Sequence, residues 1–403
     1  MFLIIIFTVY PILICLLPTQ EIKKHIHEST PRLVEQGNYP NAIIPRTKYR
    51  MDNFTDALVL MQNYLIDPQK PVSSAMLVPR QLFSENIPES LLHQIEQGDG
   101  TELNYPRYWH GNTFLIRPLL VFMDYSRIRW TLYAISTLLL IMLSCLIYKK
   151  CGLLKTLLVA FGLTCVNFFV TQFSIQFFPV WAIAFITSML MCIHYKSGTQ
   201  TLTLILFITG CITSFFDLLT TPLITLGIPL VILFMLWEKE EYIDSFIQGL
   251  KYIAILTAMW FLGFAAAWSS KWLIGTLLTD VNVFEDAFGS VLYRINNIDF
   301  SRMDAIAINT NFLFLPIIFS VLSVLLLLSL LFFRKDGIRY AAFYLIIALY
   351  PYCWFFVVSN HSFMHFWFTY RTQIITILSV LMACSSLISF EKIKKKIGHL
   401  QSE

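Results

Sequence analysis

The chain has 403 residues, of which 57% are hydrophobic and 13% are charged, and its mean hydropathy is +0.65. So few polar side chains could not cover the surface of a water-soluble fold, and we therefore expect the chain to lie mostly in lipid. The formal net charge is +4, and the basic residues stand in short clusters between apolar stretches, which argues against a nucleic-acid partner. The eight cysteines lie in or beside apolar stretches and are interpreted as buried side chains, not as a disulfide framework or a metal site.

The apolar stretches are long and do not alternate with polar residues. A backbone in lipid has to satisfy its hydrogen bonds internally, so this pattern predicts an all-α polytopic membrane protein. One crossing needs about 20 apolar residues. We therefore predict about ten transmembrane helices, near residues 2–17, 130–148, 153–170, 179–195, 201–216, 218–236, 252–269, 311–333, 340–358 and 372–390. The first stretch has no preceding basic residue and no AxA-like cleavage site, which favours a retained helix over a signal peptide.

Basic residues mark every second junction between these stretches. Short loops that carry Lys and Arg are retained in the cytoplasm, so both termini are predicted to be cytoplasmic and the protein to be a multi-pass protein of the cell membrane. Residues 18–129 and 270–310 then form extracytoplasmic loops, residues 130–390 form the transmembrane bundle, and residues 391–403 form a basic cytoplasmic tail. The marking residues are Lys149, Lys150, Lys155, Lys196, Lys239, Lys251, Arg334, Lys335, Arg339, Lys392, Lys394, Lys395 and Lys396.

The loop 18–129 holds 12 of the 29 basic residues and 12 of the 25 acidic ones, and we expect it to contain the active site. Aromatic and aliphatic residues recur throughout it, which is typical of short helices packed on a membrane or a bundle. We predict such helices at 56–64, 89–97 and 113–123, with prolines between them.

Two carboxylates, Asp52 and Asp56, stand four residues apart, and Asp52 comes two residues after Arg50. On a helix they would share one face, and mutual repulsion would raise the pKa of one of them, as a general base or a cation site requires. A helix start fits equally well, with Asp52 as N-cap and Asp56 in the first turn.

A second cluster in the same loop combines cationic and aromatic side chains. Aromatic faces bind sugar rings or interfacial lipid, and Arg and His donate to phosphate oxygens, so the cluster predicts either a substrate site or an aromatic belt at the headgroup layer. Its members are Arg107, Tyr108, Trp109, His110 and, further along, Arg117.

A third cluster follows the ninth predicted helix. His361 and His365 have the i, i+4 spacing of helical zinc ligands, but no Glu lies between them and no third ligand is evident, so phosphate contact is favoured over metal binding. Arg371 either contacts a lipid phosphate or anchors the chain at the membrane interface. Asp217 stands alone between two apolar stretches, where it is a substrate-binding group, part of a short outer turn or the N-cap of the sixth predicted helix.

This layout resembles that of the GT-C superfamily of membrane glycosyltransferases, with one helix, a large external loop with amphipathic helices and an acidic site, and then a bundle. The resemblance implies transfer of a sugar from a polyprenyl-phosphate donor on the outer face of the membrane, with an acidic residue of the first loop as base. Asp52 and Asp56 would match that base, and Arg107, His110 and Arg371 would match the cations that face the lipid phosphate. The nearest members are bacterial and act on cell-surface glycans, so the implied partners are the lipid-linked sugar, a surface-glycan acceptor and the bilayer.

Two other functions stay open from the sequence. An O-antigen-type polysaccharide polymerase or ligase would use Arg and His more than Asp. A transporter or flippase of a lipid-linked glycan would be expected to show paired repeats and midplane charges, which the sequence lacks. No cofactor is assigned, and a divalent cation is left open.

Overall fold

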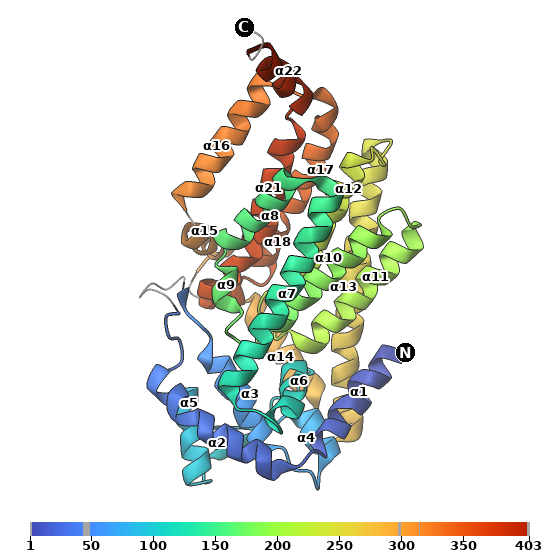
Figure 1. Cartoon of the computed structure of the whole chain (residues 1–403). Coiled ribbons are helices and arrows are strands. Elements are labelled where there is room, and N and C mark those ends of the chain that lie inside the picture. Colours follow the sequence, from blue (N-terminus) through green and yellow to red (C-terminus); the bar gives the residue numbers. More distant parts are fainter. Residues whose placement is uncertain (1, 43–48, 297–299, 314, 401–403) are drawn as a thin grey trace.

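The computed structural model describes residues 2–42, 49–296, 300–313 and 315–400. The described chain is mostly helical, which confirms the helical part of the prediction (Figure 1). Its one sheet, within these ranges, has two strands, β1 (Arg80–Leu82) and β2 (Thr101–Leu103), which pair antiparallel.

The N-terminal part of the chain contributes one helix beside the bundle and five that gather at one end of the molecule (Figure 1). The helices predicted at 56–64, 89–97 and 113–123 are present as α3, α5 and α6. A fourth, α2, was not predicted because charged residues and Pro31 surround its buried Ile22, Ile26 and Leu33. The bounds are α1 (Phe2–Cys15), α2 (Thr19–Gln36), α3 (Asn53–Leu65), α4 (Pro71–Leu77), α5 (Ile87–Glu96) and α6 (Gly111–Leu120).

The remaining helices form an elongated bundle whose far end carries α22 (Figure 1). Helix α12 lies at its centre and is almost entirely buried. The bounds are α7 (Tyr125–Cys151), α8 (Leu153–Cys165), α9 (Phe168–Thr171), α10 (Phe178–His194), α11 (Thr199–Phe216), α12 (Ile224–Lys239), α13 (Phe246–Leu278), α14 (Val283–Ile295), α15 (Arg302–Leu313), α16 (Pro316–Leu331), η2 (Lys335–Gly337), α17 (Ile338–Ala348), α18 (Tyr350–Val357), α19 (Ser359–Met364), α20 (Phe366–Thr369), η3 (Tyr370–Gln373), α21 (Ile374–Ser386) and α22 (Phe390–Leu400).

Four segments of the described chain are long and apolar enough to cross a membrane: α7, α11, α13 and residues 335–357. Two bent pairs, α1 with α2 at 84° and α15 with α16 at 85°, raise the number to as many as six. Helices lie in all ten predicted stretches, but several are short, such as α8 with 13 residues. Ten crossings and the sidedness of the loops therefore stay predictions.

The outer faces of the long helices are apolar. On α7, Leu138 and Ile141 are more than half exposed, and on α16 so are Leu326, Leu327 and Leu330. Exposed apolar surface on this scale fits a lipid environment better than water.

Helices α11 and α13 approach each other unusually closely. A Cβ atom at Gly210 would lie 2.1 Å from the Trp260 carbonyl oxygen, and one at Gly263 would lie 2.1 Å from that of Phe207. Small residues at such a crossing let two backbones meet, which is how helices associate tightly in membranes.

Helix α13 runs nine residues beyond the predicted stretch 252–269, so the predicted loop 270–310 begins inside a helix. The sequence suggested a helix end here because Trp268, Lys271 and Trp272 were interpreted as anchoring residues that flank the helix. Lys271 is in fact buried, and its Nζ donates to the Met76 carbonyl oxygen at 2.8 Å. A lysine that finds a backbone acceptor can continue a packed helix.

Candidate functional site

The two carboxylates at the start of α3 are buried and face the segment that links α9 to α10. Asp52 caps α3, since its Oδ1 accepts from the Thr55 backbone N–H at 3.0 Å, which confirms the N-cap interpretation. Asp56 lies one turn later. Its Oδ2 accepts from the Tyr125 hydroxyl at 2.6 Å and its Oδ1 from the Ile175 backbone N–H at 2.9 Å.

Burial raises the pKa of both carboxyl groups toward neutrality. The pKa of Asp52 rises to about 6, although hydrogen bonds from Thr55 and the charge of Arg371 oppose the rise. The pKa of Asp56 rises to about 7, opposed first by the charge of Arg129 and then by the Tyr125 hydroxyl, and increased by Asp52. A carboxyl group that titrates near neutral pH can accept a proton in a transition state and release it afterwards.

Two buried arginines from distant parts of the chain approach these carboxylates. Arg371 donates through Nη1 to the Trp367 carbonyl oxygen at 3.2 Å, while its Nε and Nη2 are buried with no hydrogen-bond partner in the described structure. Arg129 donates to the Met51 sulfur at 2.9 Å. In the described part of the chain, neither guanidinium forms an ion pair within 4.0 Å of Asp52 or Asp56.

Arg129 also lines a cavity of about 280 Å³ between α2, α7 and Met51, the residue that precedes Asp52. Its described lining residues include two arginines, several neutral polar groups and two aromatic rings, and none of them is acidic. The lining residues are Arg32, Gln36, Asn41, Ala42, Met51, Ser126, Arg129, Trp130 and Phe173.

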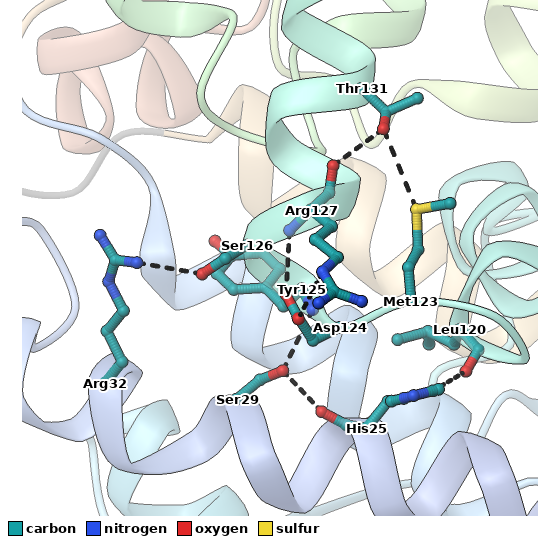
Figure 2. Close-up of polar contacts among 10 residues, drawn as sticks. All are labelled: His25, Ser29, Arg32, Leu120, Met123, Asp124, Tyr125, Ser126, Arg127 and Thr131. Atoms are coloured by element: carbon teal, nitrogen blue, oxygen red, sulfur yellow. Dashed lines mark hydrogen bonds and ion pairs between the residues drawn. The ribbon is translucent and has the colours of Figure 1, made fainter.

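Figure 2 shows how α2 holds the start of α7, and two of the residues it labels, Arg32 and Ser126, also line this cavity. The Ser29 hydroxyl accepts from the Tyr125 backbone N–H at 3.1 Å and donates to the His25 carbonyl oxygen at 2.6 Å. Arg32 donates to the Ser126 hydroxyl at 3.1 Å (Figure 2). These contacts fix the position of Tyr125, whose hydroxyl donates to Asp56.

The cluster around Arg107 is largely engaged within the protein. Arg107 forms an ion pair with Asp286 at 3.2 Å, and Trp109 donates through Nε1 to the Ala267 carbonyl oxygen at 2.7 Å. His110 contacts the Tyr105 carbonyl oxygen through Nε2 at 2.7 Å, and burial lowers its pKa to about 3. His110 is therefore neutral near pH 7, and the expectation that it supplies a cation is corrected.

Arg117 joins three helices instead of facing the carboxylates. Its Nε donates to the Ile14 carbonyl oxygen at 3.1 Å and its Nη1 to that of Asn63 at 2.8 Å. These contacts tie α6 to α1 and α3. Arg50 is half-buried and forms an isolated antiparallel β-bridge with Asn41.

The Asp217 turn and the two histidines form one unit. Asp217 accepts at Oδ1 from the Thr220 backbone N–H at 3.1 Å, which fits the short-turn interpretation. His361 meets the Leu219 carbonyl oxygen at 2.8 Å and lies 4.8 Å from His365, ring centroid to ring centroid. Within the described residues no group of three or more His, Cys, Asp or Glu side chains could hold a metal ion.

Four consecutive residues, Ser174 to Phe177, connect these clusters. Ser174 accepts from the Asp52 backbone N–H at 3.0 Å, and Ile175 donates to Asp56. Gln176 donates to the Thr220 hydroxyl next to Asp217, and the Phe177 ring lies 5.2 Å from the Arg371 guanidinium. One short segment thus brings Asp52, Asp56, Asp217 and Arg371 into a single polar layer.

Several buried polar atoms of this layer have no hydrogen-bond partner in the described structure. Unpaired buried polar atoms cost free energy, so each of them calls for a partner such as a bound water, an ion or a ligand. They are Gln176 Oε1, Asp217 Oδ2, Thr221 Oγ1, the Tyr108 hydroxyl, and Nε and Nη2 of Arg371.

Comparison with family models, curated proteins and solved structures finds no match. The GT-C resemblance therefore stays a prediction, and the layer has to be interpreted from its own chemistry.

Sequence reasoning missed three contributors to this layer: Arg129, Tyr125 and the segment 174–177. The sequence did carry one indication of the 174–177 segment. The stretch from Thr171 to Gln176 carries four polar residues between apolar helices and no Lys or Arg, which is unusual for a junction that merely meets solvent. Arg129 was assigned to the end of the loop, whereas α7 already begins at Tyr125.

Proposed function

We propose that the protein is a membrane glycosyltransferase that moves a sugar from a polyprenyl-phosphate donor to a hydroxyl group of a cell-surface glycan. One observation carries the proposal. Two buried carboxylates with raised pKa values lie one turn apart, and each has a buried arginine nearby that forms no ion pair with it within the described residues.

Asp52 is the proposed base. Within the described structure its carboxylate accepts from the Thr55 backbone N–H, whereas that of Asp56 is held by both a hydroxyl and a backbone N–H. Asp56 is a positioning residue in this proposal, because it orders Tyr125 and the Ser174–Phe177 segment and adds negative charge beside Asp52.

Arg371 and Arg129 are the proposed phosphate ligands. Arg371 has two free donor positions, and Arg129 faces a cavity with a net positive lining. Fixed cations at a leaving phosphate stabilise the charge that develops as the glycosidic bond breaks, so they favour the transition state over the ground state. Trp130 and Phe173, which line the same cavity, offer aromatic faces to a sugar ring.

The proposed reaction balances with these groups alone. The acceptor oxygen forms a bond to the sugar C1 and gives its proton to Asp52. The bond from C1 to the phosphate oxygen breaks, and polyprenyl phosphate leaves with its electron pair beside the arginines. The proton then passes from Asp52 to solvent or to the departing phosphate.

The test is transfer of labelled sugar from a polyprenyl-phosphate donor to surface glycan in membranes that contain the wild-type chain or Asp52→Asn. Asparagine keeps the N-cap contact but cannot accept a proton, so we expect transfer to fall about 100-fold to 10,000-fold while donor binding survives.

Asp56→Asn is the matched control on the same helix turn, and we expect a smaller loss from it, because its role is to hold Tyr125. Equal transfer by wild type and Asp52→Asn would overturn the base assignment. No transfer by wild type with any donor would favour a transporter of the lipid-linked glycan instead.

A further inference from the structure

A cavity of about 740 Å³ lies beside α22. Figure 1 shows α22 at the opposite end of the bundle from α2 and α3. The walls of the cavity come from five places in the sequence: the junction of α7 and α8, the end of α12, the residue before η2, the end of α21 and its following turn, and the start of α22.

Cationic side chains dominate the lining. Lys155, Lys239, Arg334 and Lys394 line the cavity, and Glu238 is the one acid among its described lining residues, while Arg334 also pairs with Glu241 at 3.6 Å. No other cavity described above has such an excess.

Glu238 is already compensated by part of this set. It accepts from the Lys155 Nζ at 3.3 Å and from the Tyr344 hydroxyl at 3.0 Å, and an Arg334 nitrogen lies 3.9 Å away. Lys239 and Lys394 form no ion pair with an acid in the described part of the chain, and the Lys239 Nζ donates to the neutral Lys150 carbonyl oxygen, so its charge is not compensated. Their charges are the part of the lining that a bound anion would neutralise.

The same cavity has an apolar rim that lies open on the surface. Leu153 is 60% exposed and Phe390 is 42% exposed, and both line the cavity. Helix α8 also begins here without a side-chain cap, so the positive end of its dipole adds to the lysines. A ligand with an anionic head and a hydrocarbon body matches both features, whereas a free phosphate matches only the first.

We propose that this cavity binds the phosphate headgroup of an acidic membrane lipid, with its acyl chains against Leu153 and Phe390. The seven residues from Phe390 to Lys396 carry four lysines, which would hold α22 against a negatively charged membrane surface. This lipid site is independent of the glycosyl transfer proposed for the other end of the molecule.

The test uses the purified full-length chain in detergent and measures its affinity for dioleoyl phosphatidylglycerol by native mass spectrometry. In the pocket variant, Lys239→Gln with Lys394→Gln, the Kd is expected to rise by at least about tenfold, because each lysine near a lipid phosphate contributes substantially to binding. The matched control is Lys149→Gln with Lys395→Gln. It removes the same number of charges, from the end of α7 and from α22, without changing a residue of the cavity lining, so its Kd is expected to stay within about twofold.

Three results would overturn the proposal. They are equal affinities of the pocket and control variants, equally tight binding of phosphatidylcholine, and displacement of the lipid by inorganic phosphate at the same concentration. Should the pocket variant fail to fold, Lys394→Glu alone carries the same test, since Lys394 is exposed on α22.

Discussion

The two ends of the bundle differ in whether their buried acids form ion pairs with nearby cations. At the α22 end, Glu238 is buried and meets Lys155 and Arg334 within 4.0 Å. At the α3 end, Asp52 and Asp56 are equally buried, yet within the described structure they form no ion pair with the arginines beside them.

The difference separates a structural tie from a reactive arrangement. A buried acid that is matched by cations holds helices together, because losing either partner leaves a charge without compensation. A buried acid without a matched cation has a raised pKa and leaves the neighbouring guanidinium free to bind something else. The α3 end keeps two buried acids without matched cations, which lowers stability and is typical of a site that binds a ligand or catalyses a reaction.

The sharpest test of the comparison asks whether the two ends lie on opposite sides of the membrane. Glu85 near the α3 end and Gly198 near the α22 end are both exposed, and each can be replaced by cysteine in a chain whose exposed Cys145 and Cys353 are serine. We expect an impermeant thiol reagent added to intact cells to label Glu85→Cys and not Gly198→Cys. The reverse pattern would invert the predicted orientation.

The next test concerns the unpaired guanidinium. If Arg371 binds a donor phosphate, Arg371→Lys replaces a planar fork by a point charge, and transfer of labelled sugar should fall by about tenfold or more. Arg117→Lys is a contrasting change, since Arg117 contacts backbone carbonyl groups of α1 and α3. Arg117→Lys should lower the free energy of unfolding more than it lowers the transfer rate per folded molecule. Normal sugar transfer by Arg371→Ala would show that Arg371 does not bind the donor phosphate and contributes only to packing.

Glu238 should behave as a structural residue. Glu238→Gln removes the acid between Lys155 and Arg334, and we expect the free energy of unfolding to fall by on the order of 3 kcal/mol. Thermal unfolding in detergent measures the change. Sugar transfer per folded molecule should stay near the wild-type rate, and a large loss of transfer would show that the two ends are coupled.

The smallest expected effect is the dependence of stability on pH. Burial raises the pKa of Asp52 to about 6 and of Asp56 to about 7, above their unfolded values, so the folded state binds more protons than the unfolded state in this range. The contribution to stability is therefore present at low pH and is lost as the pH rises through about 6 to 7. In Asp56→Asn, the melting temperature measured between about pH 5 and pH 8 should change less steeply than in wild type. An unchanged slope would mean that Asp56 does not titrate there.

The apolar patterning already predicted much of the fold. Helices occupy each of the ten predicted stretches, and α3, α5 and α6 were expected from their spacing between prolines. The pattern could not tell a helix that crosses lipid from one that other helices enclose, since both are apolar on all sides, as α12 is. It also ended α13 too early at Lys271, whose backbone acceptor at Met76 is distant in sequence.

The candidate site was predicted only in part, and the division has a physical reason. Asp52 and Asp56 were found because two carboxylates one turn apart are conspicuous in any sequence. His110 was expected to be cationic, but its charge state depends on burial, which composition does not reveal.

What the sequence determined by itself is therefore the solvent, the helical class and the residue types available for chemistry, because hydropathy and helical periodicity are local properties. Only the tertiary structure decided which residues meet. Arg371 lies 319 positions after Asp52 in the chain, and the Ser174–Phe177 segment joins them through contacts that no local pattern encodes. Burial, which sets the pKa values of the carboxyl groups, arises from that same packing of distant segments, and so it too belongs to the fold and not to the sequence alone.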